Sequence, residues 1–227
     1  HLQAAVAEDP TDAVSLGYLV ELHRKGNELV LLVNDLGALA ALHAAADRSE
    51  QAFECRIERG RILLRLGRDA EAAHCLEEAR EVAPPPRRGE VLGILAEARR
   101  RAGDVAGARV AWAAAREDAS APPAAAIYAL HEAECALQLG DPEGALPLLE
   151  RAVKHAPAHE AEQALVHIID LRLERGEVKD AAKMLEAPAD ACSLSGRRFE
   201  EDHRPKARAS AMDFVDRSRN PFDSRRD

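Results

Sequence analysis

The chain has 227 residues and a formal net charge of −9 at pH 7, with 31 % charged and 3 % aromatic residues. This acidity argues against nonspecific binding to nucleic acid or to an anionic membrane surface, because both favour basic proteins. The most apolar stretch, residues 29–46, is interrupted by Asn34, Asp35 and His43, so we expect no membrane span. Abundant alanine and leucine, both strong helix formers, predict an all-α protein.

The first residues suggest a piece of a larger pattern. The chain opens with His1 rather than methionine, and residues 1–10 are typical of the tail of a helix whose beginning is missing. We therefore expect a fragment or a processed product, in which a targeting signal cannot be sought. A helix is predicted over residues 12–25, ended by Gly26, and a partner helix over residues 28–46, in which Leu31 holds the position of an alanine in later hairpins.

The stretch Ile62–Pro84 defines a unit that recurs along the chain. A helix ends at Gly67, which can adopt the left-handed conformation of a helix stop, and a second helix begins at Asp69, whose carboxylate can cap it. The stop glycine returns as Gly103, Gly140 and Gly176, at spacings of 36, 37 and 36 residues. Such a period is typical of a stacked repeat array.

The regular hairpins follow in chain order. Their helix pairs are predicted at 49–66 with 69–82, 88–102 with 105–118, 123–139 with 142–155, and 160–175 with 178–187. In the turn Gly140-Asp141-Pro142, glycine stops one helix, aspartate caps the next, and proline occupies a position where no N–H is needed. The proline-rich connections at 84–86 and 122–123 join hairpins without breaking the repeat phase.

These residues resemble the tetratricopeptide-repeat family. Small residues stand where the first helix crosses the second (Gly60, Ala96 and Ala133), and the first three stop glycines are each followed by an alanine, a bulky residue and another alanine. The fourth repeat departs from this pattern at Ile169 and Pro188, so we expect it to end the superhelix. Three repeats match over about Phe53–Pro157, and two more match partly. The resemblance implies a right-handed α-solenoid of helix–turn–helix repeats over residues 1–187. It places Trp112, the bulky residue of its repeat, between hairpins.

In this family the first helices of successive hairpins line a concave groove that holds an extended peptide or a helix. The resemblance therefore implies a groove that is basic in its first half and acidic in its second. The lysine and asparagine carboxylate clamp of the family's chaperone-binding members is absent. The positions expected to face the groove are Arg61, Leu64, Arg65, Glu97, Arg100, Arg101, Ile127, His131, Glu134, Leu137, His167, Asp170 and Glu174.

No catalytic or metal-binding constellation stands out in the sequence. His131 and Cys135 lie on one helical face, but the second histidine and the third ligand of a zincin are missing. His131 and His167 hold equivalent positions in adjacent repeats, so we expect them about 10 Å apart, too far for a shared metal. No phosphate-binding loop or nucleophile elbow is present. We expect no enzyme activity and no cofactor.

The cysteines show no CxxC motif and no regular disulfide spacing. Cys55 and Cys75 lie on the two helices of one hairpin, where a bridge is conceivable, but buried thiols in a reducing compartment are favoured. We therefore expect a cytoplasmic protein.

From residue 188 the alanine and leucine pattern is lost and an irregular, arginine-rich tail begins. Residues 197–227 hold nine Arg or Lys against seven Asp or Glu, opposite in sign to the body of the chain. A short helix is predicted over about 206–217. Phe199, Phe214 and Phe222 are expected to anchor the tail to a folded surface.

The leading hypothesis is a non-catalytic scaffold or adaptor that binds a protein or peptide partner through the groove or the tail, as a component of a multi-protein complex. Two alternatives remain open at the level of sequence. One is a regulatory or sensing segment of a larger signalling or transcriptional protein. The other is an accessory module of a larger enzyme.

Overall fold

The computed structural model describes residues 28–186, together with residues 9, 18, 20, 21 and 23. Within these residues the chain is helical and contains no strand, so the predicted all-α class is confirmed. The elements are α3 (Leu29–Ala45), α4 (Ser49–Arg65), α5 (Asp69–Glu81), the short 3₁₀ helix η1 (Pro85–Arg87), α6 (Arg88–Arg101), α7 (Val105–Glu117), α8 (Pro122–Gln138), α9 (Pro142–His155), α10 (Ala158–Glu174) and α11 (Val178–Glu186).

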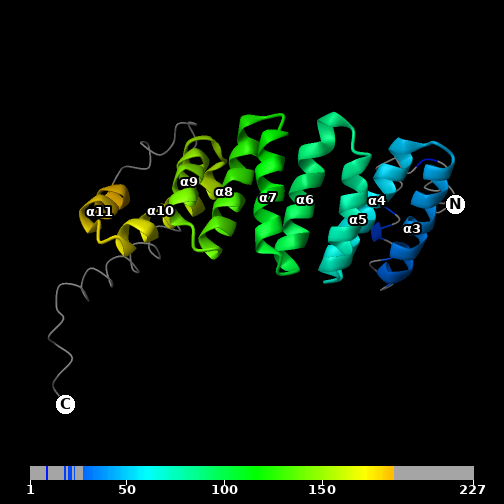
Figure 1. The fold of residues 1–227 in the computed structure, drawn as a ribbon, viewed down its shortest axis with the longest axis horizontal. Helices are drawn as coiled ribbons and strands as arrows, with labels where there is room; N and C mark the ends of the chain where they lie inside the picture. Colours follow the sequence, from blue (N-terminus) through cyan, green and yellow to red (C-terminus); the bar gives the residue numbers. More distant parts are fainter. Residues whose placement is uncertain (1–8, 10–17, 19, 22, 24–27, 187–227) are drawn as a thin grey trace, which may run out of the picture.

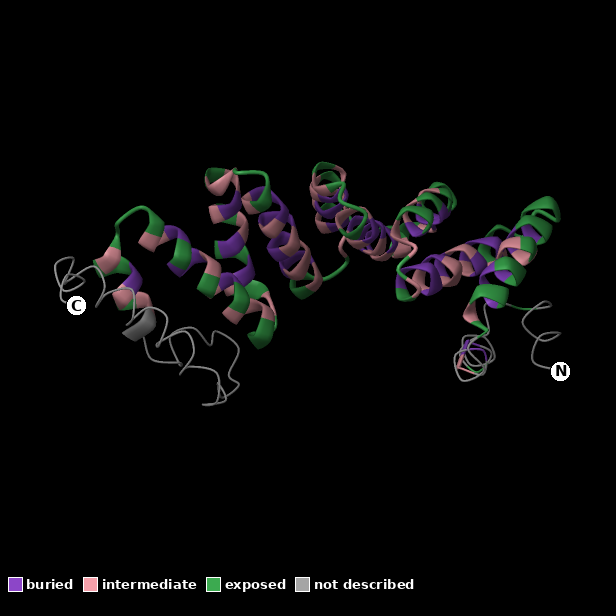
Figure 2. Ribbon diagram, turned by 90° about the horizontal axis from the view of Figure 1, so that it is seen from below, coloured by how far each residue is buried: buried purple, intermediate pink, exposed green. Residues whose placement is uncertain are grey.

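Consecutive helices pack side by side in chain order, and together they form an elongated α-solenoid (Figure 1). Each predicted helix between residues 28 and 186 is present, with its ends within two residues of the prediction. The predicted helix over 12–25 and the segment 1–10 lie mostly outside the described residues. Buried side chains line the sides of the helices that face their neighbours, as Figure 2 shows.

The predicted glycine stops are confirmed by the backbone. Gly67, Gly103, Gly140 and Gly176 have φ angles of 71°, 88°, 75° and 76°, in the left-handed region. At the third turn the Gly140 N–H donates to the Leu137 carbonyl at 3.0 Å, and the Asp141 N–H donates to Ala136 at 2.9 Å. These bonds satisfy carbonyls that would otherwise be left free at the helix end.

The aspartates after the turns do not all act as caps. Asp141 accepts a hydrogen bond from the Gly144 N–H at 2.9 Å, and Asp104 accepts one from Gly107 at the same distance. Asp69 makes no such bond. Its carboxylate instead lies 3.0 Å from Nε of Arg101, so the expectation that Asp69 caps α5 is wrong.

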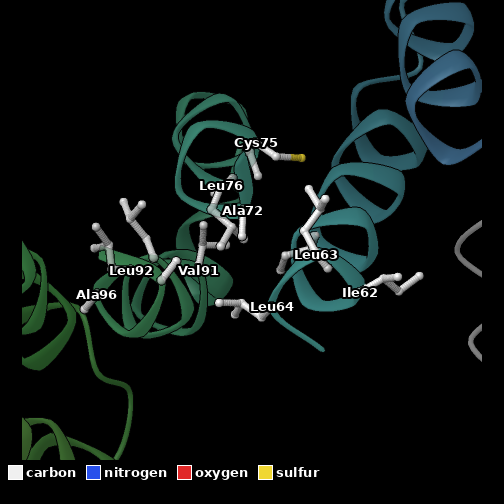
Figure 3. Close-up of a cluster of buried hydrophobic side chains, with 14 of the residues drawn as sticks. Ile62, Leu63, Leu64, Ala72, Cys75, Leu76, Val91, Leu92 and Ala96 are labelled. Carbon is white, nitrogen blue, oxygen red and sulfur yellow. The ribbon is translucent and has the colours of Figure 1, made fainter. Parts of the chain in front are cut away.

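The core is built where three consecutive helices meet. Figure 3 shows Leu63 of α4, Leu76 of α5 and Val91 of α6 in one buried cluster. Gly60 makes this approach possible, because a Cβ there would lie 2.7 Å from Leu76. The predicted small residue at the crossing of the two helices is thereby explained, since a larger one would push Leu76 out of the core.

The core is divided into two apolar clusters that meet at α8. The first runs from α3 to α8 and includes Trp112, and the second joins α8, α9 and α10 around Leu149. Trp112 is 5 % exposed and packs against the Tyr128 ring of α8 with centroids 5.6 Å apart. The prediction that this tryptophan is packed between hairpins is confirmed.

Helix α3 departs from the regular hairpins. It has 17 residues, against 13 in α5 and α7, and its buried face contains Leu32, Val33 and Leu36. Leu31 is 55 % exposed, whereas Ala72 of α5 is buried. The alignment of Leu31 with that alanine is therefore wrong, because α3 begins three residues after Gly26 whereas α5 begins two residues after Gly67, so the equivalent position is Leu32.

Candidate functional site

The side chains predicted to bind a partner come mainly from the first helix of each hairpin, namely α4, α6, α8 and α10. We call the exposed and partly exposed side chains of these four helices, with Arg87 of η1, the first-helix face. Within the described residues this face carries ion pairs that link α4 to α6 and α8 to α10.

Arginine and glutamate side chains connect α4 with α6. Arg61 forms ion pairs with Glu58 of its own helix and with Glu90 of α6. Arg87 pairs with Glu54 of α4 and, at 2.8 Å, with Glu90. The guanidinium of Arg87 also lies over the ring of the buried Phe53, 5.0 Å from its centroid, in cation–π geometry. Charged groups of both helices therefore hold this part of the face in place.

The same pairing neutralises the half of the face that the sequence analysis expects to be basic. Arg100 makes two parallel bonds of 2.8 Å to Glu97, a bidentate arrangement on one helix. Because these arginines have carboxylate partners on the face itself, the prediction of a basic first half is wrong. Arg65, exposed at the end of α4, has no ion pair within residues 28–186.

Two of the residues expected to face a bound partner, Leu64 and Arg101, contribute to the packing of the helices instead. Leu64 is buried in the first core cluster and presents little free surface. Arg101 donates to the Leu64 carbonyl at 2.8 Å and pairs with Asp69, so it ties α6 to the turn between α4 and α5.

In the second half of the face, two histidines converge on one carboxylate. Nδ1 of His131 lies 3.0 Å from Oε2 of Glu134 on the same helix, and Nε2 of His167 on α10 lies 3.8 Å from Oε1. The ring of His131 also packs on Trp112, with centroids 4.8 Å apart. The separation of the two helices does not by itself indicate that long side chains from both meet at one carboxylate.

These contacts change the acidity of both partners. Burial alone would raise the pKa of Glu134, but the bonds and charges of His131 and His167 outweigh it and lower that pKa to about 2. Interaction with the Glu134 carboxylate raises the pKa of His167 above its ordinary value, against the opposing effect of burial. Near neutral pH, Glu134 is therefore an anion, and the side chains that contact its two oxygens are imidazoles.

The end of the face on α10 is acidic. Asp170 and Glu174 are exposed, four residues apart on one helix, and neither forms an ion pair with a lysine or arginine in residues 28–186. Burial, together with the negative charge of Glu174, raises the pKa of Asp170, although His167 acts in the opposite direction. This part of the face is acidic, as the sequence analysis expects.

Apolar side chains lie between the charged groups. Ile127 and Leu137 of α8 are both partly exposed, and Leu137 packs against the second core cluster. Tyr128 is half-buried against Trp112 and beside Gly93, where a Cβ would come within 3.0 Å of the tyrosine ring. Burial, with the nearby charge of Glu90, raises the pKa of Tyr128.

Several side chains of the face are missing from the sequence analysis. They are Glu54, Glu58, Arg87, Glu90 and Tyr128. The spacing of Arg87 and Glu90, three residues apart across a helix start, is an available signal for a local ion pair. Nothing local indicates that Arg87 also reaches Glu54, because that contact depends on how the hairpins stack.

Other features of the described residues bear on chemistry. No group of three or more His, Cys, Asp or Glu in this part of the chain is arranged to hold a metal ion. Cys55, Cys75 and Cys135 are free and buried, as predicted, and burial raises the pKa of Cys55 to about 11. None of the described helices has the length and apolarity needed to cross a membrane. Phe199, Phe214, Phe222 and Cys192 lie outside the described residues.

Comparisons with known proteins support the repeat assignment. The family model described as tetratricopeptide repeat matches residues 59–122, 95–161 and 132–191, which together span more than half of the chain. Among curated proteins, none matches the sequence significantly.

Two similar solved structures are crystal structures of nearly identical tetratricopeptide-like repeats from a protein described as a kinesin light chain of Podosopora anserina. The first has a TM-score of 0.61 and 19 % identity, covering 85 % of this chain and 100 % of the other. The second, a variant with one substitution, has a TM-score of 0.60 and 18 % identity, covering 90 % and 98 %. At this identity the likeness concerns the fold alone. With the repeated family match and the stacked hairpins, the chain belongs to the tetratricopeptide-repeat family.

Proposed function

We propose that this protein is a non-catalytic scaffold or adaptor that binds a segment of a protein partner through the first-helix face. Tetratricopeptide repeats are typically interaction modules, and this supports the general role. The observation that carries the finer proposal is that ion pairs join successive first helices at two junctions of this face, Arg61–Glu90 between α4 and α6 and His167–Glu134 between α8 and α10. These contacts restrict side chains that a partner would otherwise have to order, which lowers the entropic cost of binding.

The distribution of charge indicates which kind of segment suits the face. Arginine and glutamate alternate over α4 and α6, so this part offers paired donors and acceptors with little net charge. Over α10 the exposed Asp170 and Glu174 favour a lysine or arginine of the partner. Ile127 and Leu137 provide apolar contact between these two parts. The proposed ligand is an extended or helical segment with a basic end.

The arginine-rich tail, residues 188–227, is a second element through which a partner could be bound. Its net positive charge and its three phenylalanines support a role as a binding arm or as an internal occupant of the first-helix face. The two roles differ in whether the tail is protected from solvent in the protein alone.

The proposal is tested by selecting peptides that bind the full chain from a random displayed library and measuring their affinity for charge-reversal variants. Arg65→Glu and Asp170→Lys change exposed side chains of the first-helix face. Lys154→Glu and Glu150→Lys make the same charge changes on the exposed side of α9 and serve as matched controls.

We expect at least one of the face variants to lose about tenfold in affinity, or about 1.4 kcal/mol, while the α9 variants keep the affinity of the unmodified chain. Equal effects of both pairs of variants would contradict the proposal, because they would indicate binding governed by net charge. Effects confined to α9 would place the binding surface on the second helices.

A further inference from the structure

Two equivalent junctions between successive first helices are held by ion pairs of different kinds. Between α4 and α6 the ion pairs are Arg61–Glu90 and Arg87–Glu54, the second formed by η1 at the start of α6. Between α8 and α10 the ion pair is His167–Glu134. Arginine keeps its charge at all physiological pH values, whereas histidine gains or loses its charge between about pH 5 and pH 8. The second junction is therefore sensitive to protons in a range where the first is not.

At the second junction, the Glu134 carboxylate is positioned by contacts that do not involve α10. His131 contacts one oxygen of Glu134 from the same helix, and the His131 ring is itself packed on Trp112 of α7. His131 thus restrains the Glu134 side chain, whose other oxygen, Oε1, contacts His167. Successive first helices contact each other far less than they contact the second helix between them. The His167–Glu134 ion pair is therefore one of few direct contacts between α8 and α10.

The neighbouring charges also act on this pair. Arg100 of α6 and Cys135 of α8 lie close enough to interact electrostatically with Glu134, and Arg100 favours its ionised form. On α10, the carboxylate of Asp170 favours the protonated form of His167. Protonation of His167 therefore places a cation between two carboxylates, one on each side of the junction.

We propose that Glu134 and His167 form a proton-controlled clasp between the third regular hairpin and the last one, closed in mild acid and weakened at alkaline pH. The direction follows from His167. A group whose pKa is raised in the folded protein stabilises that state below its ordinary pKa, and this contribution is lost as the pH rises through the raised value. The clasp is fully formed between the ordinary pKa values of glutamate and histidine, about 4.5 and about 6.5. This proposal does not depend on what the face binds.

Hydrogen exchange on the full chain tests the proposal at about pH 5.5 and about pH 8, with exchange times corrected for the intrinsic effect of pH. We expect amides of α10 and α11 to be protected about two- to fivefold more at the lower pH, relative to amides of α4 and α6 in the same sample. Glu134→Gln and His167→Gln should each remove this difference.

Glu90→Gln is the matched control, because it removes the carboxylate of the arginine junction. It should reduce protection of α4 and α6 by a similar factor at both pH values. An unchanged pH dependence of α10 and α11 in the Glu134→Gln variant would overturn the proposal. In an independent NMR titration, His167 should lose its proton at higher pH in the unmodified chain than in Glu134→Gln, and equal midpoints would also overturn it.

Discussion

His167 in α10 reaches back to Glu134 in α8, with Nε2 and Oε1 3.8 Å apart, so that a side chain of one repeat forms an ion pair with a side chain of the preceding repeat. The two helices are separated in sequence by all of α9. In a solenoid most contacts are between neighbouring helices, and stability is approximately a sum of local terms. Direct links between first helices add coupling along the face on which we propose that a partner binds.

Glu134 should contribute to the free energy of unfolding near neutral pH and lose that contribution in acid. Its pKa is lowered to about 2 in the folded protein, so its stabilising contribution is present above its ordinary pKa and is lost as the pH falls towards 2. We expect Glu134→Gln to cost about 1–2 kcal/mol of unfolding free energy near pH 6 and much less near pH 2.5. Urea melts at both pH values measure this, with Glu150→Gln on α9 as the baseline. A cost that is independent of pH would contradict the prediction.

Trp112 should be the most sensitive single position of the array. It projects from α7 and is buried against α6 and α8, and truncating a buried tryptophan typically costs about 3–5 kcal/mol. Urea denaturation of Trp112→Ala checks this loss against Val110→Ala, which changes a 68 % exposed residue of the same helix and should cost under about 0.5 kcal/mol. A loss below about 1 kcal/mol at Trp112 would mean that the packing described here is wrong.

Gly60 and Leu76 should behave as a coupled pair. A methyl group at Gly60 would lie 2.7 Å from the Leu76 side chain, so we expect Gly60→Ala to destabilise the chain by about 1–3 kcal/mol. Combining it with Leu76→Ala should recover part of that cost, because the smaller residue makes room for the methyl group. The measurement is a double-mutant cycle by urea denaturation, and strictly additive effects would show that the two residues do not share this space.

The tail should be held against a folded surface, although its composition alone favours disorder. If it packs on its own array, amides around Phe214 will be protected from hydrogen exchange in the isolated full chain. If it is an assembly arm, protection will arise only when a partner is added. Fast exchange under both conditions would disprove docking in either form and leave the tail as a linker.

Much of the fold could be predicted because its determinants are local. The left-handed stops at Gly67 and Gly140, the proline at the start of α9 and the period between hairpins are all readable from neighbouring residues. The turn before α4 lacks such a local signal. Asp47 adopts φ of 58° and closes the same kind of helix stop without glycine, so no clear marker stands there in the sequence.

The face could be predicted only in outline, since its chemistry depends on pairs between repeats. Helix position predicts that Arg61 and Arg100 face a basic half of the groove, yet both are paired with glutamates of the first-helix face. The position of a residue on a helix indicates the direction of its side chain but not its partner, because the end of a long side chain can lie several ångströms from the backbone. The convergence of His131 and His167 on Glu134 is the clearest case.

The central claim, that a partner segment binds on the first-helix face, is tested most directly by hydrogen exchange of the full chain with and without a library-selected peptide. We predict new protection on two or more of the helices α4, α6, α8 and α10, with α5, α7 and α9 unchanged on their exposed sides. Protection concentrated on α5, α7 and α9, or on none of these helices at saturating peptide, would contradict the claim.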